Sequence, residues 1–205
     1  MLDLTEMFGE GWCVTLAPLE PVQALNRMGV QDATLVDDGL ESVGRRMERH
    51  EGPDVLLLGR ELRNGWSVVL ELEGNWGWAG MDADVLSALS ADGRVAVSVF
   101  SDPNQQKLQV DFDGTEVGYL DVLSGFFLFE PTDEVPAVAA LLAAGFHRLD
   151  RLDEPTGQVA AMDPLERAAL ALCAVTGVEL TASDFDGPWL ACLSAPSERR
   201  NQRSA

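Results

Sequence analysis

The sequence has few of the residues on which metal sites and nucleophilic catalysis depend. Its only histidines are His50 and His147, and neither has a second histidine or a cysteine three or four residues away. The zinc motif H-E-x-x-H and the serine-hydrolase motif G-x-S-x-G are both absent. Cys13, Cys173 and Cys192 are widely spaced and form no C-x-x-C pair, which is typical of reduced, packed thiols in a cytoplasm. We therefore expect no metal and no cofactor.

Long hydrophobic runs are also missing. No apolar run approaches the roughly 20 residues that a helix needs to cross a bilayer. The longest candidate, residues 135–146, is rich in alanine and is typical of a buried helix. The first ten residues lack the basic and apolar regions of a secretion signal. These absences predict a cytoplasmic location and no membrane binding.

Basic residues are scarce, and acidic ones are abundant. The chain has 14 lysine and arginine residues against 34 aspartate and glutamate residues, which gives a formal net charge of −20. Such a charge repels nucleic acid and anionic lipid, so we expect neither as a partner. The charge is compatible with a basic protein partner, and solubility alone is the simpler explanation for it.

The composition is otherwise that of a globular protein, 46% hydrophobic and 23% charged, and 205 residues suit one domain. Residues 66–73 alternate, with Trp66, Val68 and Leu70 on one side and more polar residues on the other, which predicts a strand with one buried and one wetter face. Asn64-Gly65 and Asp113-Gly114 predict two antiparallel hairpins. Residues 95–100 are almost wholly apolar and predict a central strand. Further strands are expected at residues 11–17, 33–36, 126–129 and 188–193.

Capping residues predict the helices. Asp82 precedes a helix over residues 83–90, and Asp133 precedes one that runs to Ala144. Asp163, with Pro164 after it, begins a helix that ends at Gly177, and helices are also expected over residues 21–29 and 38–50. The fold class is therefore α+β, a mixed and mainly antiparallel sheet with helices packed on it. We expect residues 1–149 to form the main domain, 150–161 a linker, 162–195 a helix–strand unit that completes the same domain, and 196–205 a disordered tail.

A glycine-rich segment carries the candidate site. Residues 74–80 read G-N-W-G-W-A-G between a strand and a helix, but the spacing matches neither phosphate-binding glycine motif, and the chain's only lysine is the distant Lys107. A loop with two tryptophans fits better, and an exposed tryptophan would be a strong contact for a partner. The candidate binding residues are Asn75, Trp76, Trp78, Asp82, Asp102 and Asn104.

The same segment carries a family resemblance. The segments G-W-C-V-T-L at residues 11–16, G-W-S-V-V-L-E-L-E-G-N-W-G-W-A-G at 65–80, and L-S-A-L-S-A-D-G-R-V-A-V-S-V-F-S-D-P-N at 86–104 resemble an uncharacterised family of small acidic bacterial proteins from high-GC genomes that carry a domain of unknown function. The likeness covers roughly residues 11–113, with weaker agreement in the helix after Asp163. It implies no established activity and no catalytic residue. It does imply a setting in interaction or conflict systems.

We therefore expect a non-enzymatic binding protein that meets a basic protein partner, in an immunity or defence system. The alternative is a small-ligand sensor or an enzyme with a pocket near Trp76 and Asp82. Paired carboxylates could serve such an enzyme, because the chain has many of them.

Overall fold

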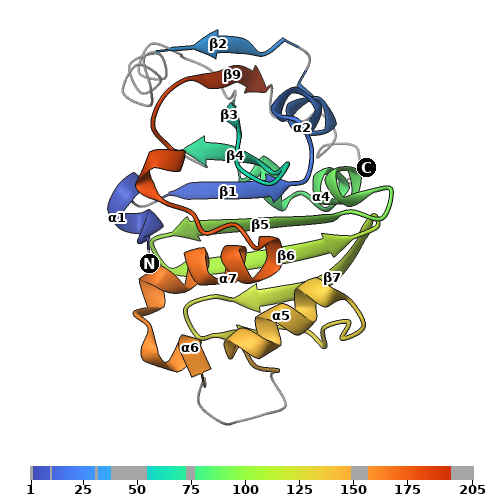
Figure 1. Cartoon of the computed structure of the whole chain (residues 1–205), viewed down its shortest axis with the longest axis vertical. Helices are drawn as coiled ribbons and strands as arrows, with labels where there is room; N and C mark the ends of the chain where they lie inside the picture. The colour runs from blue at the N-terminus through green and yellow to red at the C-terminus, as the bar shows by residue number, and fades with distance from the viewer. Residues whose placement is uncertain are drawn as a thin grey trace.

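The computed structural model describes residues 2–9, 11–30, 32–37, 55–72, 77–148 and 157–194. These residues build one nine-stranded sheet in the order β2-β9-β3-β4-β1-β5-β6-β7-β8, and Figure 1 shows this order from β2 at the top to β7 near the bottom. The strands are β1 Trp12–Ala17, β2 Thr34–Val36, β3 Val55–Glu61, β4 Ser67–Leu72, β5 Val95–Asp102, β6 Gln105–Phe112, β7 Thr115–Asp121, β8 Phe126–Phe127 and β9 Trp189–Ser194.

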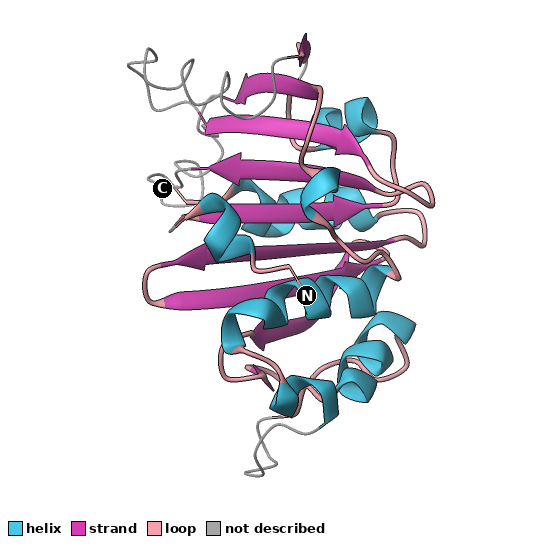
Figure 2. Cartoon of the chain, turned by 60° about the vertical axis from the view of Figure 1, so that its left-hand side comes forward, coloured by secondary structure: helices cyan, strands magenta, loops and turns pink. Residues whose placement is uncertain are grey.

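The helices pack on both faces of this sheet (Figure 1, Figure 2). They are α1 Leu4–Phe8, α2 Pro21–Arg27, α4 Ala83–Ser90, α5 Pro136–Ala144, α6 Gly157–Ala161 and α7 Arg167–Thr176, with 3-10 turns η1 Ala79–Met81, η2 Pro164–Glu166 and η3 Ala182–Asp184. The predicted α+β class is confirmed. Every pair of described strands is antiparallel, and the parallel contact among the described residues is a single bridge between Phe126 and His147.

Both predicted hairpins form at the predicted turns. Asn64 and Gly65 have φ values of 61° and 75° between β3 and β4. Asp113 and Gly114 have φ values of 48° and 77° between β6 and β7. Consecutive positive φ values suit the twist of two-residue hairpin turns, and glycine and aspartate or asparagine adopt them at low cost.

The sheet separates two apolar layers. On one face α1, α5, α6 and α7 bury the larger core, which includes Trp12, Leu70 and Val97 from β1, β4 and β5. On the other face α2 and α4 bury a smaller core with Val69 and Ala96. Val68 and Leu70 of β4 and residues 96–100 of β5 therefore lie inside the molecule, as the strand pattern predicted.

Two local predictions were wrong. The second face of β4 is not wet, because Ser67, Val69 and Glu71 are all buried beneath α2 and η1. The cap of α5 is Val135, which makes no side-chain bond to the helix, and Asp133 instead pairs with Arg148. A polar strand pattern and a capping residue are both local signals, and the tertiary packing overrides them here.

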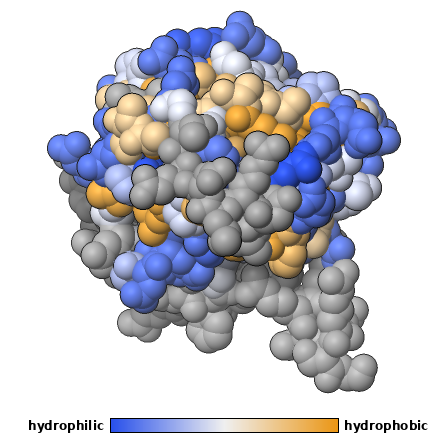
Figure 3. All heavy atoms as spheres, turned by 90° about the horizontal axis from the view of Figure 1, so that it is seen from below, coloured by the Kyte–Doolittle hydropathy of each residue, from blue (hydrophilic) through white to orange (hydrophobic). Residues whose placement is uncertain are grey.

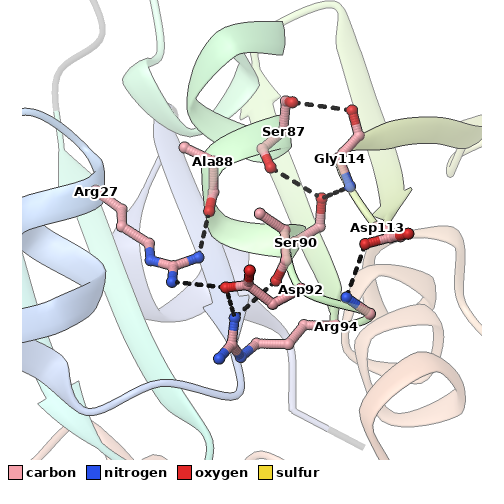
Figure 4. A network of polar contacts seen from close by, with 10 residues as sticks. Arg27, Ser87, Ala88, Ser90, Asp92, Arg94, Asp113 and Gly114 are labelled. Carbon is pink, nitrogen blue, oxygen red and sulfur yellow. Dashed lines mark hydrogen bonds and ion pairs between the residues drawn. The ribbon is translucent and has the colours of Figure 1, made fainter.

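The C-terminal end of α4 is fastened to its neighbours by a polar network (Figure 4). Arg27 of α2 donates to the carbonyl of Ala88 at 2.6 Å and pairs with Asp92 at 3.2 Å. Ser87 donates to the carbonyl of Gly114, and the Gly114 N–H donates to Ser90. The bond from Arg27 satisfies a carbonyl that the helix end leaves open, and the bonds of Ser87 and Ser90 tie α4 to the β6–β7 turn.

The C-terminal part of the chain supplies the second strand from one edge of the sheet. Asp163 caps η2, which leads into α7, and α7 ends at Gly177 in the left-handed conformation. β9 then inserts between β2 and β3. Within the expected linker, residues 157–161 form α6 with Val159 buried. The expected helix over residues 38–50, the linker residues 150–156 and the expected tail 196–205 lie outside the described residues.

Candidate binding surface

Four of the six candidate binding residues, Trp78, Asp82, Asp102 and Asn104, lie among the described residues, and the other two lie outside them. Asn75 and Trp76 belong to that second group. Trp78 is only 9% exposed, and its ring lies 6.3 Å from that of Phe100 in a small cluster with Cys13. Trp78 is therefore a packing residue that offers little surface to a partner.

The three polar candidates have roles in local turns. Asp82 caps α4 by accepting a bond from the Asp84 N–H at 2.9 Å. Asp102 accepts bonds from the backbone N–H groups of Asn104 and Gln105, at 2.9 Å and 3.1 Å, in the β5–β6 turn. Burial alone would raise the pKa of Asp102, but these bonds and one from the Gln105 side chain outweigh it, and the pKa is lowered. Asn104 is exposed in that turn.

A buried polar network lies beneath η1. Glu71 of β4 accepts bonds from the N–H groups of Ala79 and Gly80 at 2.7 Å and 2.8 Å. Beside it, Ser98 contacts both Thr15 at 2.9 Å and Cys13 at 3.2 Å. The carboxylate thus holds the turn after the glycine-rich segment against the sheet, because it satisfies two backbone donors that would otherwise be buried without partners.

The polar network beneath η1 has a structural role, and its cysteine is not an activated nucleophile. Burial, followed by the negative charge of Glu71, raises the pKa of Cys13 well above its ordinary value. The thiol therefore stays protonated at neutral pH, whereas reactive cysteines have a lowered pKa and some exposure. Within the described ranges, no three histidine, cysteine, aspartate or glutamate side chains gather in a way that would hold a metal ion.

A second group of polar and aromatic side chains lies along β6 and β7, on the face of the sheet that carries Thr15 and Ser98. Here Gln109 stands opposite Tyr119, and Asp111 stands opposite Glu116 after a register shift. Tyr119 stacks on Phe129, with ring centroids 6.0 Å apart and 29° between the planes. We call Asp111, Glu116, Tyr119 and Phe129 the acid–aromatic patch. It brings one exposed ring, one partly buried ring and two carboxyl groups to one part of the sheet.

The exposed ring of the patch is held in place by the backbone. Phe129 is 64% exposed, the largest exposure among the described large hydrophobic side chains. On either side of it, the Leu128 N–H donates to the Tyr119 carbonyl at 2.7 Å, and the Thr132 N–H donates to the Val117 carbonyl at 2.9 Å. The ring is therefore presented by an ordered segment alongside β7. Figure 3 views this end of the molecule from below and shows hydrophobic surface between hydrophilic regions.

The electrostatics of the patch favour positive charge. Burial is the largest cause of a raised pKa of Asp111, the bond from Gln109 at 2.9 Å opposes the rise, the nearby Glu116 adds to it, and the net pKa is about 6. Burial and then the charges of Glu116 and Asp121 raise the pKa of Tyr119. Burial is the larger cause of both shifts, and a cation would relieve only the smaller one, the repulsion from neighbouring carboxylates.

The cations nearest to the patch in the chain already have carboxylate partners. Lys107 pairs with Asp121 at 2.6 Å, and Arg148 pairs with Glu130 at 2.7 Å and with Asp133. Among the described residues, no lysine or arginine lies within ion-pair distance of Asp111 or Glu116. Like charges directly opposite each other on neighbouring strands are destabilising, so this pair costs stability in the free protein.

Reasoning from the sequence did not single out this patch. The sequence predicts a hairpin at Asp113-Gly114 and a short strand over residues 126–129, and neither prediction marks a binding site. β8 in fact ends at Phe127, and the chain then continues beside β7 with Phe129 turned outward. An apolar residue directly before Glu130 is the signal that the sequence offers, but only the fold brings Phe129 onto the ring of Tyr119 in β7.

The fold defines an α+β protein in which the polar network under η1 holds that turn against the sheet. The chain belongs to the Family of unknown function (DUF6461), whose model matches residues 2–198. The resemblance to a family that carries a domain of unknown function is thereby confirmed, over nearly the whole chain. No curated protein and no solved structure matches this chain. In the part of the chain that the structure describes, no helix is long and apolar enough to cross a membrane.

Proposed function

We propose that this protein is a non-enzymatic binding module that meets a basic protein partner through its acidic surface. The observation that carries the proposal is the acid–aromatic patch, where an exposed aromatic ring lies beside carboxyl groups that have no cation among the described residues. Exposed aromatic side chains contribute strongly to protein interfaces, and complementary charge speeds association and selects partners.

The contacts of the basic residues within the chain support the proposal. Each lysine or arginine within the described ranges has a contact inside the chain, namely Arg27, Arg60, Arg63, Arg94, Lys107, Arg148 and Arg167. Several exposed carboxylates have no ion pair with a described residue, namely Glu6, Glu20, Glu116, Glu134 and Glu179. The surplus negative charge is therefore presented outward, where a basic partner would be attracted and nucleic acid repelled.

The finer setting that we propose is the cytoplasm of a bacterium, in an immunity or defence system, which follows the sequence resemblance described above. The competing function is a small-ligand sensor or an enzyme that uses the segment from Trp76 to Asp82. A ligand that binds only the native state raises the melting temperature, so thermal-shift measurements with nucleotides and metal ions separate the two functions.

Affinity capture from a lysate at about 50 mM and then about 300 mM salt tests the proposal. An unrelated acidic protein of similar size and net charge serves as the control. We expect the protein to retain a basic protein at the lower salt, to lose much of it at the higher salt, and to retain more of it than the control does. Equal recovery on the control, or no captured protein at either salt, would contradict the proposal.

A further inference from the structure

The acid–aromatic patch combines three features that together suit one kind of side chain. Tyr119 and Phe129 offer nearly parallel rings, Glu116 offers an exposed carboxylate, and Asp111 stands behind it on the neighbouring strand. We propose that this patch is the site where the basic partner inserts an arginine side chain, whose guanidinium stacks on Phe129 and pairs with Glu116. The inference rests on the proposed function and adds the chemistry by which the partner is recognised.

Arginine fits this geometry better than lysine. A guanidinium is planar, stacks on aromatic faces, and donates two parallel bonds to a carboxylate, whereas an ammonium is a compact and strongly hydrated charge. The chain already uses such a contact internally, because the guanidinium carbon of Arg60 lies 5.9 Å from the centroid of the Trp189 ring. The patch presents a similar acceptor at the surface.

Two features of the acid–aromatic patch favour binding of an arginine side chain. The backbone bonds of Leu128 and Thr132 to β7 hold Phe129 in position before any partner arrives, so little entropy is lost in ordering it. The repulsion between Asp111 and Glu116 is relieved when a cation arrives, so part of the binding free energy comes from removing an unfavourable contact. The neighbouring cations Lys107 and Arg148 are paired with carboxylates, which limits their repulsion of an incoming arginine.

The test uses the full chain and three fluorescent peptides that alternate glycine with arginine, with lysine or with citrulline. Citrulline has nearly the shape of arginine without its charge. Binding is measured by fluorescence anisotropy at about 50 mM salt. We expect the arginine peptide to bind most tightly, the lysine peptide more weakly, and the citrulline peptide weakest of all.

Two substitutions with matched controls locate the site. Phe129→Ala and Glu116→Gln should each weaken the arginine peptide about three- to five-fold, in line with cation–π contacts and ion pairs at exposed positions. Leu35→Ala removes another exposed apolar side chain, on β2 at the opposite edge of the sheet, and Glu20→Gln removes the same charge at the start of α2. These controls should change the affinity less than two-fold, in keeping with surface positions outside the site.

The outcomes distinguish failure of the arginine site from failure of the proposed binding function. If Phe129→Ala and Glu116→Gln behave like their controls while the wild type still binds the arginine peptide, the site is wrong and the proposed function stands. If the lysine or citrulline peptide binds as tightly as the arginine peptide, the choice of arginine is wrong. If neither basic peptide binds the wild type, both claims fail. Unchanged melting temperatures of the four variants exclude misfolding as the cause of a loss.

Discussion

Gly80 provides the sharpest test of the network beneath η1. A Cβ atom at this position would overlap Thr15 Oγ1 and would lie 2.7 Å from Ser98 Oγ and 3.0 Å from Glu71 Oε1. All three side chains are buried, so none can move into solvent without exposing its neighbours. Gly80→Ala should therefore push η1 away from the sheet, or displace the polar side chains below it.

The magnitude follows from these contacts. Overpacking a buried site costs about 1–3 kcal/mol, and a hydrogen bond to a charged group contributes about 1.5–3 kcal/mol. A shift of η1 that relieves the overlap would weaken the bonds from Ala79 and Gly80 to Glu71, so the two costs partly replace each other. We expect Gly80→Ala to lower the free energy of unfolding by about 3–5 kcal/mol.

Urea unfolding in a double-mutant cycle measures this cost and its cause. In a Thr15→Ala background the largest overlap is gone, so Gly80→Ala should cost about 1–2 kcal/mol less. Thr15→Ser keeps the hydroxyl and should give no such relief. A cost below about 1 kcal/mol for Gly80→Ala, or an equal cost in all three backgrounds, would refute the assigned role of the network.

Two further predictions concern buried polar groups. Burial and Glu116 raise the folded-state pKa of Asp111 to about 6, above its unfolded value, so its ionisation lowers stability as pH rises from about 4 to 6. Asp111→Asn should therefore raise the free energy of unfolding by about 1–3 kcal/mol at pH 7.5 and change it little near pH 4, and a gain that is equal at both values would contradict this cause. Trp12 and Trp189 are both fully buried, but only Trp189 donates its indole N–H, to the Phe185 carbonyl at 3.3 Å, whereas Trp12 Nε1 has no partner among the described residues. Trp189→Phe should cost about 1 kcal/mol more in urea unfolding than Trp12→Phe, and the reverse order would be inconsistent with these contacts.

Much of the local structure could be predicted from the sequence because its signals are local. The turns at Asn64-Gly65 and Asp113-Gly114 require residues that adopt positive φ, and Asp82 caps α4 through an atom two residues away. The alternation in β4 correctly placed Leu70 in the core. Each of these signals involves neighbours in the chain, so one sequence is enough to recognise them.

The strand order could not be predicted, because it depends on contacts between distant segments. β1 lies between β4 and β5, and β9 lies between β2 and β3. Burial of the second face of β4 follows from the same long-range arrangement, since η1 covers Glu71 there. Asp133 shows the same limit, because its pairing with Arg148 depends on the path of the chain after α5.

The candidate site was harder to predict than the fold. Trp78 was proposed as a contact because exposed tryptophans are strong interface residues, but its ring packs on Phe100. The sequence does not predict the acid–aromatic patch, because Tyr119 and Phe129 are separated by a turn and because Glu116 stands opposite Asp111 only through the register shift in β6–β7. Composition identified the negative charge of the chain, and only the tertiary structure shows where an exposed ring accompanies it.

The most direct test of the arginine site uses the only tyrosine in the chain, Tyr119, as a reporter. With ¹³C-labelled tyrosine, the ring signals in an NMR titration belong to this one residue, which stacks on Phe129. We expect the arginine peptide to shift these signals to a saturating limit and the citrulline peptide to leave them nearly unchanged. Ring signals that stay in place while the arginine peptide binds would contradict this expectation.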